Sequence, residues 1–164
     1  MNNEPAATAA GQGTSVLAAG AGRTFSNEDQ GQPIPHRNED LLRKVYVAFA
    51  TGDLATLVGL FTDDFEWHMA GQFPLAGDYK GAEEVKGLFS KIFELLGPDG
   101  SLQLDPEEIL ANDDYAMALV HYIGRRGDKV LDMRNIHVWR VAGGELAEYW
   151  FHPRDLRAVE TFWS

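Results

Sequence analysis

Two histidines and a tyrosine have the types and spacing that proton transfer requires. His121, His137 and Tyr149 lie in three consecutive stretches with strand-like patterns. A histidine with a near-neutral pKa can take or give a proton at pH 7, and a phenol can donate a hydrogen bond to a developing oxyanion. We therefore take these three residues as candidate catalytic residues, with His137 as the general acid or base and His121 as a second proton-transfer or water-positioning group.

The periodicity of the three stretches is typical of strands with one apolar face. Residues 115–123 alternate large odd-numbered side chains with mostly small even-numbered ones, as a pleated strand with one crowded face requires. In residues 130–141 the odd positions are apolar apart from Asn135 and His137, and in residues 145–152 Tyr149 again falls at an odd position. We predict that the odd-numbered residues of all three strands line one pocket.

The lengths of the connecting turns decide how these residues meet. A three-residue loop at residues 142–144 places His137 opposite Tyr149, where Cβ atoms lie about 5 Å apart. A three-residue loop at residues 126–128 leaves His121 about 13 Å from His137 along the sheet, so that a ligand could lie between them. A two-residue loop would turn one histidine to the other face, so this prediction depends on loop length.

Apolar and amide side chains on the same faces are the predicted substrate-binding residues. In a cone-shaped sheet an aromatic stripe serves both as core and as pocket wall. The set consists of Asn135, Trp67, Met69, Trp139, Phe151, Met117 and Leu119. Two simpler interpretations remain open: His137 is a core histidine bonded to a backbone group or hydroxyl, and His121 bonds only Asn135 or a water molecule.

Composition limits the class of function. The chain has 164 residues, a formal net charge of −11 and no cysteine. This charge argues against nucleic acid and anionic membranes as partners, and the missing thiols exclude disulfides and cysteine-ligated metals. Residues 1–35 form an Ala/Gly-rich stretch that we expect to be disordered. We expect a cytoplasmic protein with no cofactor and no metal site, since His68 and the His152–Asp155 stretch match no known ligand spacing.

The order of the expected elements indicates an α+β fold. We predict a cone-shaped, curved, mixed but mainly antiparallel sheet with three N-terminal helices packed on its concave face. The helices are expected at residues 38–52, 54–61 and 82–96, a first strand at 65–69, a loop at 70–81, and a four-strand meander at 102–110, 115–123, 130–141 and 145–152.

Several motifs resemble those of SnoaL-like proteins in the nuclear-transport-factor-2-like superfamily, which includes ketosteroid isomerase, scytalone dehydratase, limonene epoxide hydrolase and polyketide cyclases. The resemblance covers residues 38–164 and identifies residues 36–164 as a SnoaL-like α+β barrel domain. The motifs are Thr-Gly-Asp-Leu at 51–54, Leu-Phe-Thr-Asp-Asp-Phe at 60–65, Leu-Ala-Gly-Asp-Tyr-Lys-Gly at 75–81, Ile-His-Val-Trp-Arg-Val at 136–141 and Trp-Phe-His-Pro-Arg-Asp at 150–155.

The resemblance transfers site residues only in part. The base aspartate of the steroid isomerase falls on Met69 and its hydrogen-bonding aspartate on His137, so steroid isomerase chemistry is not expected. The two pocket histidines of scytalone dehydratase fall near His121 and His137, whereas its helical tyrosine and aspartate fall on Phe49 and Ala50. The resemblance therefore implies a histidine pair without its usual helpers.

These observations favour a cofactor-independent enzyme that acts on a hydrophobic small molecule by dehydratase, isomerase or cyclase chemistry, with epoxide opening as a weaker option. The alternatives are a non-catalytic binding module with the same pocket and a dimeric interaction domain whose pocket is vestigial. The outer face of the sheet carries an apolar patch, which a second subunit of a homodimer is expected to cover. The patch is predicted to contain Val120, Tyr122, Ile136, Val138 and Trp150.

Overall fold

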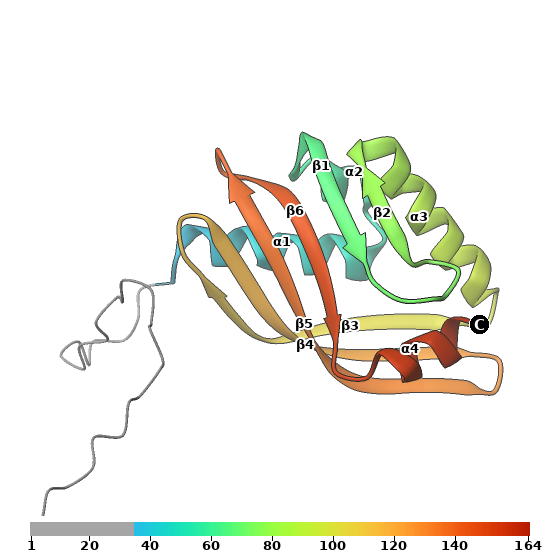
Figure 1. Ribbon diagram of the computed structural model, residues 1–164. Helices are drawn as coiled ribbons and strands as arrows, with labels where there is room; N and C mark the ends of the chain where they lie inside the picture. Colours follow the sequence, from blue (N-terminus) through green and yellow to red (C-terminus); the bar gives the residue numbers. More distant parts are fainter. Residues whose placement is uncertain (1–34) are drawn as a thin grey trace, which may run out of the picture. The chain divides into compact units, whose positions relative to one another are not determined.

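The computed structural model describes residues 35–164. The predicted disordered stretch at residues 1–35 lies outside the described residues except for Pro35. The described part consists of a strongly curved six-stranded sheet and four helices (Figure 1).

The sheet has the order β2-β1-β6-β5-β4-β3. Neighbouring strands are antiparallel except β1 and β6, which are parallel, so the prediction of a mixed, mainly antiparallel sheet is confirmed. Strand β2 lies within the stretch predicted to be a loop. The strands are β1 (Phe61–Met69), β2 (Gly77–Lys80), β3 (Ser101–Ala111), β4 (Tyr115–Arg126), β5 (Lys129–Ala142) and β6 (Glu145–Pro153).

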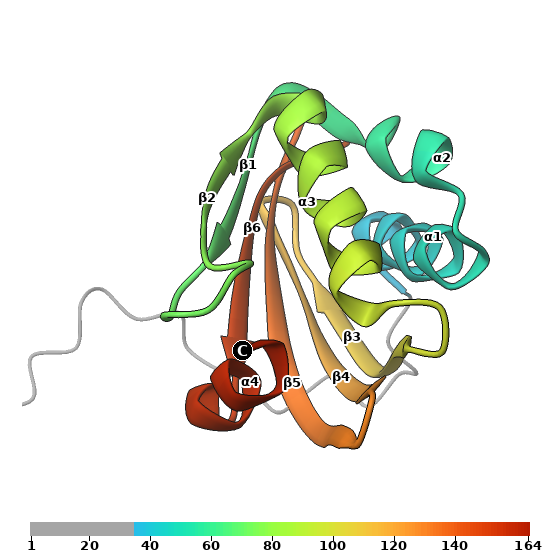
Figure 2. The ribbon, with the colours of Figure 1, turned by 90° about the vertical axis from the view of Figure 1, so that its right-hand side faces the viewer.

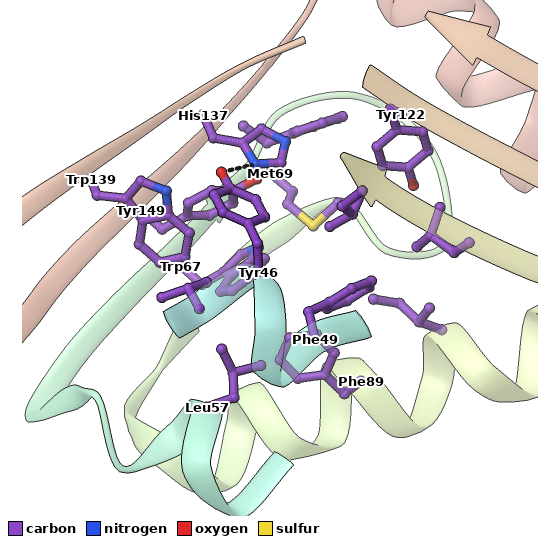
Figure 3. Close-up of a pocket in the computed structure, with 15 residues that line it drawn as sticks. Tyr46, Phe49, Leu57, Trp67, Met69, Phe89, Tyr122, His137, Trp139 and Tyr149 are labelled. Atoms are coloured by element: carbon purple, nitrogen blue, oxygen red, sulfur yellow. Dashed lines mark hydrogen bonds between the residues drawn. The ribbon is translucent and has the colours of Figure 1, made fainter. Parts of the chain in front are cut away.

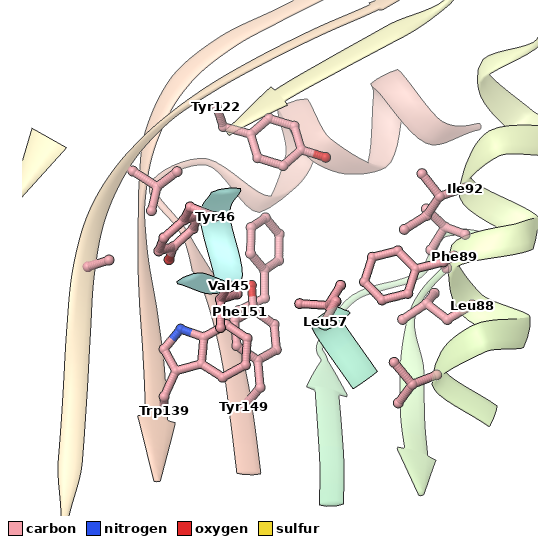
Figure 4. Close-up of a cluster of buried hydrophobic side chains, with 14 of the residues drawn as sticks. Val45, Tyr46, Leu57, Leu88, Phe89, Ile92, Tyr122, Trp139, Tyr149 and Phe151 are labelled. Carbon is pink, nitrogen blue, oxygen red and sulfur yellow. The ribbon is translucent and has the colours of Figure 1, made fainter. Parts of the chain in front are cut away.

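Three helices cover the concave side of the sheet, as predicted (Figure 2). They are α1 (Arg37–Thr51), α2 (Leu54–Val58) and α3 (Gly81–Leu96). Helix α1 ends at Gly52, whose φ of 69° is a left-handed conformation that glycine adopts without steric cost. The apolar stripes of α1 and α3 face the sheet and form the core with it (Figure 4). None of the helices within residues 35–164 has the length and apolar character needed to span a bilayer.

A fourth helix, α4 (Leu156–Trp163), was not predicted, and it lies at one end of the curved sheet (Figure 2). Its Phe162 lies over Gly124 of β4, where an added Cβ would come within 2.7 Å of the aromatic ring. Arg126 fixes the end of this helix by donating to the carbonyl oxygens of Phe162 and Ser164, both at 2.9 Å. Glycine at position 124 is therefore required for the close packing of α4 on the sheet.

Both hairpin turns have two residues, and the predicted three-residue loops are wrong. Arg126 pairs with Lys129 across Gly127 and Asp128, and Ala142 pairs with Glu145 across the two glycines at 143–144. Gly127, Gly143 and Gly144 have φ values of 58°, 62° and 89°. Positive φ at such positions gives the tight turns whose twist matches that of the flanking strands.

The shorter first turn reverses the face of β4. Its even-numbered residues are buried on the concave side, and its odd-numbered residues point outward. In β6 a bulge next to Arg140 and Val141 offsets the shorter second turn and returns the odd-numbered residues to the concave side. His137 consequently pairs with Phe151 instead of Tyr149, which lies opposite Trp139.

Candidate functional site

A small cavity lies between the concave face of the sheet and helices α1 and α3 (Figure 3). Its volume is about 50 Å³, and its lining is almost entirely aliphatic and aromatic. A water molecule needs about 10–15 Å³ by this measure, so the space corresponds to only a few waters. The side chains that combine polar atoms with a place in the lining are Tyr46, Trp67, Tyr122, His137, Trp139 and Tyr149.

His137 is the one histidine in this lining, and one of its two ring nitrogens has no partner. The side chain is 2% exposed. Its Nδ1 lies 3.0 Å from the hydroxyl oxygen of Tyr46, whereas Nε2 is buried without a hydrogen bond to any described residue. Burial lowers the pKa of His137 to about 3, with a smaller effect in the same direction from His152. The imidazole is therefore neutral at pH 7.

Tyr46 is the residue of this site that the sequence analysis missed. It lies on the core-facing stripe of α1 and is 91 positions away from His137, so periodicity alone predicts only a buried side chain. Burial raises the pKa of Tyr46 well above its usual value, so the hydroxyl keeps its proton. If Tyr46 donates to Nδ1, then Nε2 of His137 carries the imidazole proton; if Tyr46 accepts from Nδ1, then Nε2 is a free acceptor.

Tyr149 contacts His137 through its ring instead of its hydroxyl. The two ring centroids are 5.4 Å apart with an interplanar angle of 85°, and Tyr149 also packs on Trp67 and Trp139 at 4.1 and 4.3 Å. Burial raises the pKa of Tyr149 well above its usual value, so this phenol is also protonated at neutral pH. Its expected role as a donor to an oxyanion stays a prediction.

The other predicted wall residues divide into two groups on the concave side. Trp67, Met69, Trp139 and Phe151 line the cavity, and the indole N–H groups of Trp67 and Trp139 are buried without partners. Asn135 is 1% exposed but outside the lining, and its Oδ1 accepts from the backbone N–H of Arg154 at 3.4 Å. The structure therefore brings His137 together with four of the predicted wall residues, in an apolar setting.

A comparison with known protein families identifies the family of this chain. The profile of the SnoaL-like domain matches residues 42–149. The chain belongs to the SnoaL-like domain family. The uncharacterised protein Rv0034 of Mycobacterium tuberculosis H37Rv is 33% identical over 126 residues, which cover 76% of this chain and 95% of that protein.

Solved structures agree on the fold. Bal32a, from a soil-derived mobile gene cassette, has 29% identity and a TM-score of 0.72, with 78% of this chain and 97% of Bal32a covered. A candidate polyketide cyclase from Xanthomonas campestris has 15% identity and a TM-score of 0.63, with coverage of 78% and 97%. At such low identity the second likeness shows the fold alone.

The predicted two-histidine site does not exist in this SnoaL-like domain. His121 lies on the convex face, where its Nε2 is 2.7 Å from Oδ1 of Asp132 and its β5 neighbour is Arg134. Met117, which is 45% exposed, and the half-buried Leu119 point outward with it and cannot bind a ligand in the cavity. The cause is the two-residue turn before β5, which moves every odd-numbered residue of β4 to the outer face.

The convex face of the SnoaL-like domain also carries a group that resembles a metal site. Single ligand atoms of Glu66, His68 and Glu148 lie within 4.8 Å of one another. Lys80 bonds Glu66 at 2.7 Å, and Arg140 bonds Glu148 at 2.9 Å. Because each carboxylate already has a cationic partner, we interpret this group as an ion-pair network.

His68 lies at the centre of this network. Its Nδ1 and Nε2 lie 2.7 Å from Asp78 and 3.0 Å from Glu148. Partial burial lowers the pKa of His68, but the hydrogen bonds to Asp78 and Glu148 outweigh it, and the pKa lies above its usual value.

Proposed function

We propose that this SnoaL-like domain binds an apolar small molecule in the cavity and holds one oxygen of that molecule by a hydrogen bond to Nε2 of His137. The observation that carries the proposal is the buried, unpartnered Nε2 of His137, a residue in the wall of a mainly apolar cavity. A buried polar group without a partner costs about 1–3 kcal/mol. A ligand that supplies the partner recovers this energy, whereas a purely apolar ligand does not.

We propose that Nε2 is the donor in this hydrogen bond, with Tyr46 donating to Nδ1. With a pKa of about 3, His137 is a weak base at pH 7, and accepting a full proton inside the cavity is unfavourable. A neutral imidazole that receives a hydrogen bond from Tyr46 at Nδ1 instead presents Nε2–H as a donor. The favoured ligand group is therefore a carbonyl or another oxygen that accepts a hydrogen bond.

A catalytic version of the same site is the second candidate. A neutral imidazole N–H that polarises a carbonyl stabilises an enolate-like oxyanion, which is the charge that forms in isomerisation and cyclisation of ketones. The Tyr46–His137 pair favours this role, and a candidate polyketide cyclase is among the fold neighbours. The chemistry would depend on His137, with Tyr149, whose ring packs on the imidazole, as a further hydroxyl, and without His121.

Binding of a simple ketone tests the proposal. We expect 2-butanone, followed by NMR titration, to bind wild-type protein and to lose about 5- to 150-fold in affinity in His137→Leu, since one lost hydrogen bond is worth about 1–3 kcal/mol. The matched control is Val47→Leu, which changes a side chain that is 63% exposed and lies outside the cavity. Native mass spectrometry of the purified protein would identify a co-purified ligand. Equal ketone affinity in wild type and His137→Leu would contradict the proposal.

We also propose that the domain forms a homodimer through its convex face. The reversal of β4 corrects the expected patch, because Val120 and Tyr122 are buried inside. The patch is formed by Leu110, Tyr115, Met117, Leu119, Ile136, Val138 and Trp150. Pairs of both charges, such as Arg134 with Glu107, border it, which suits a two-fold contact between identical surfaces. Light scattering of Ile136→Asp should give a monomer, and an unchanged mass relative to wild type would oppose the proposal.

A further inference from the structure

A second hollow adjoins the cavity on the helical side of the cone. It is a groove of about 430 Å³ between the C-terminal ends of α1 and α3 and the start of β3. Phe49, Ile92 and Leu102 line both the groove and the cavity. The two spaces are therefore neighbours that share one wall.

The lining of the groove is uncharged, which distinguishes it from two other surface hollows of the described residues. The two other hollows of similar size each include Lys, Arg or Asp side chains in their walls. The groove has none, and Phe93 at its edge is 51% exposed. An apolar chain laid in the groove would cover this aromatic ring, at a gain of about 25 cal/mol for each Å² removed from water.

Phe49 forms the boundary between the two spaces. Its ring packs against Phe89 of α3 with centroids 5.9 Å apart, and both rings line the cavity on the side of the helices (Figure 3). The cavity beyond this boundary holds only about 50 Å³, which suits a short polar head but not a larger molecule. A ligand of more than a few heavy atoms that reaches His137 must therefore extend beyond the cavity, and the wall shared with the groove, which includes Phe49, is one place where it could do so.

We propose that the groove is the second half of the ligand site. The ligand is an elongated, uncharged molecule whose carbonyl head bonds His137 and whose unbranched apolar tail passes Phe49 into the groove. This inference rests on the proposed function, because it places the head of the ligand at the same Nε2. Phe49 is then a specificity-determining residue, since it stands in the wall that the tail has to pass.

A series of methyl ketones tests this arrangement. We expect the affinity of wild-type protein, measured by NMR titration, to rise about two- to fourfold per added methylene from 2-hexanone to 2-dodecanone, since a buried methylene is worth up to about 0.8 kcal/mol. In Ala50→Trp the new indole projects from a residue of the groove wall and should block the tail, so the rise should be lost across the series. The matched control is Val47→Trp, a 63% exposed position on the same helix that lines neither space and should keep the rise.

A second blocking variant, Ser101→Trp, enters the groove from β3 and should stop the rise in the same way. Phe49→Ala should admit cyclohexyl methyl ketone, which wild-type protein is expected to exclude.

Two failures can be told apart. If 2-hexanone binds wild-type protein and depends on His137, but longer ketones bind no more tightly, the inference about the groove is wrong and the proposed function is intact. Loss of all ketone binding in wild type would instead overturn the proposed function. If the blocking variants changed only the oligomeric mass, the groove would be a contact between copies and the inference would fail.

Discussion

Histidines on the two faces of the sheet have pKa values shifted in opposite directions. On the concave face His137 is 2% exposed, shares one hydrogen bond with Tyr46 and has a pKa lowered to about 3. On the convex face His68 lies between Asp78 and Glu148, and its pKa is raised. The environment that the fold supplies, rather than the residue type, therefore decides which histidine stays neutral and available to a ligand.

The largest expected effect tests which residues belong to each face. Met133 of β5 is 5% exposed in the core, whereas Met117 of β4 is 45% exposed on the convex side. We expect Met133→Ala to lower the free energy of unfolding by about 2–5 kcal/mol and Met117→Ala by less than about 0.5 kcal/mol. Urea denaturation measures both, at a concentration where the oligomeric state is the same. Equal losses would show that the assignment of β4 to the faces is wrong.

The next largest effect is a loss of folding stability at acid pH, caused by His137. Its folded-state pKa lies below the usual value of about 6.5, so below that pH the unfolded chain takes up a proton that the folded protein does not. Stability should therefore fall by up to about 1.4 kcal/mol per pH unit from pH 6.5 down towards 4.5 because of this one residue. Urea denaturation of His137→Gln across this range should show a correspondingly shallower fall. Parallel curves for the variant and wild type would refute the neutral, buried imidazole.

A smaller effect is expected from the hydroxyl of Tyr46. Tyr46→Phe removes the partner of Nδ1 of His137 and leaves that nitrogen buried and unpaired, which should cost about 1–3 kcal/mol of stability. Under the proposed function the ketone affinity should fall as well, because the imidazole loses the bond that is proposed to keep its proton on Nε2. Tyr122→Phe is the control, since it removes a buried hydroxyl that lines the same cavity and has no bond to His137. The same loss of ketone affinity in both variants would argue against a specific role for Tyr46.

The smallest effect on stability is expected from the ion-pair network around His68 on the convex face. The raised pKa of His68 means that its ion pairs stabilise the fold below about pH 6.5 and lose this contribution as the pH rises through the folded-state value. Since Asp78 is 82% exposed in its side chain, we expect His68→Gln to cost no more than about 1 kcal/mol at pH 6. The difference from wild type should shrink by pH 9. A difference that instead grows with pH would contradict the assigned network.

Much of the fold was predictable because its signals are local. The apolar stripe of α3 and the odd-numbered apolar residues of β5 and β6 gave the correct elements and faces. The family motifs gave the architecture. The short helix α4 was missed, although Val159, Phe162 and Trp163 at helical spacing were a signal for it.

The site was harder to predict because it depends on two turns and one distant contact. In β4 the small side chains Ala116 and Ala118 face inward, with Ala118 next to His137, so the crowded face is not the buried one. The sequence around Gly127 does not show whether the turn has two residues or three. The contact between Tyr46 and His137 joins a helix to a strand, and no periodicity within either element encodes it.

The most direct test of the account is nitrogen-15 NMR of the His137 ring. We predict one neutral tautomer with the proton on Nε2 from pH 8 to pH 5, and a change in the Nε2 resonance alone when 2-butanone is added. Protonation of this ring near pH 6.5, or an Nε2 signal that does not respond to any ketone that binds, would contradict the claim that His137 is the polar anchor of the cavity.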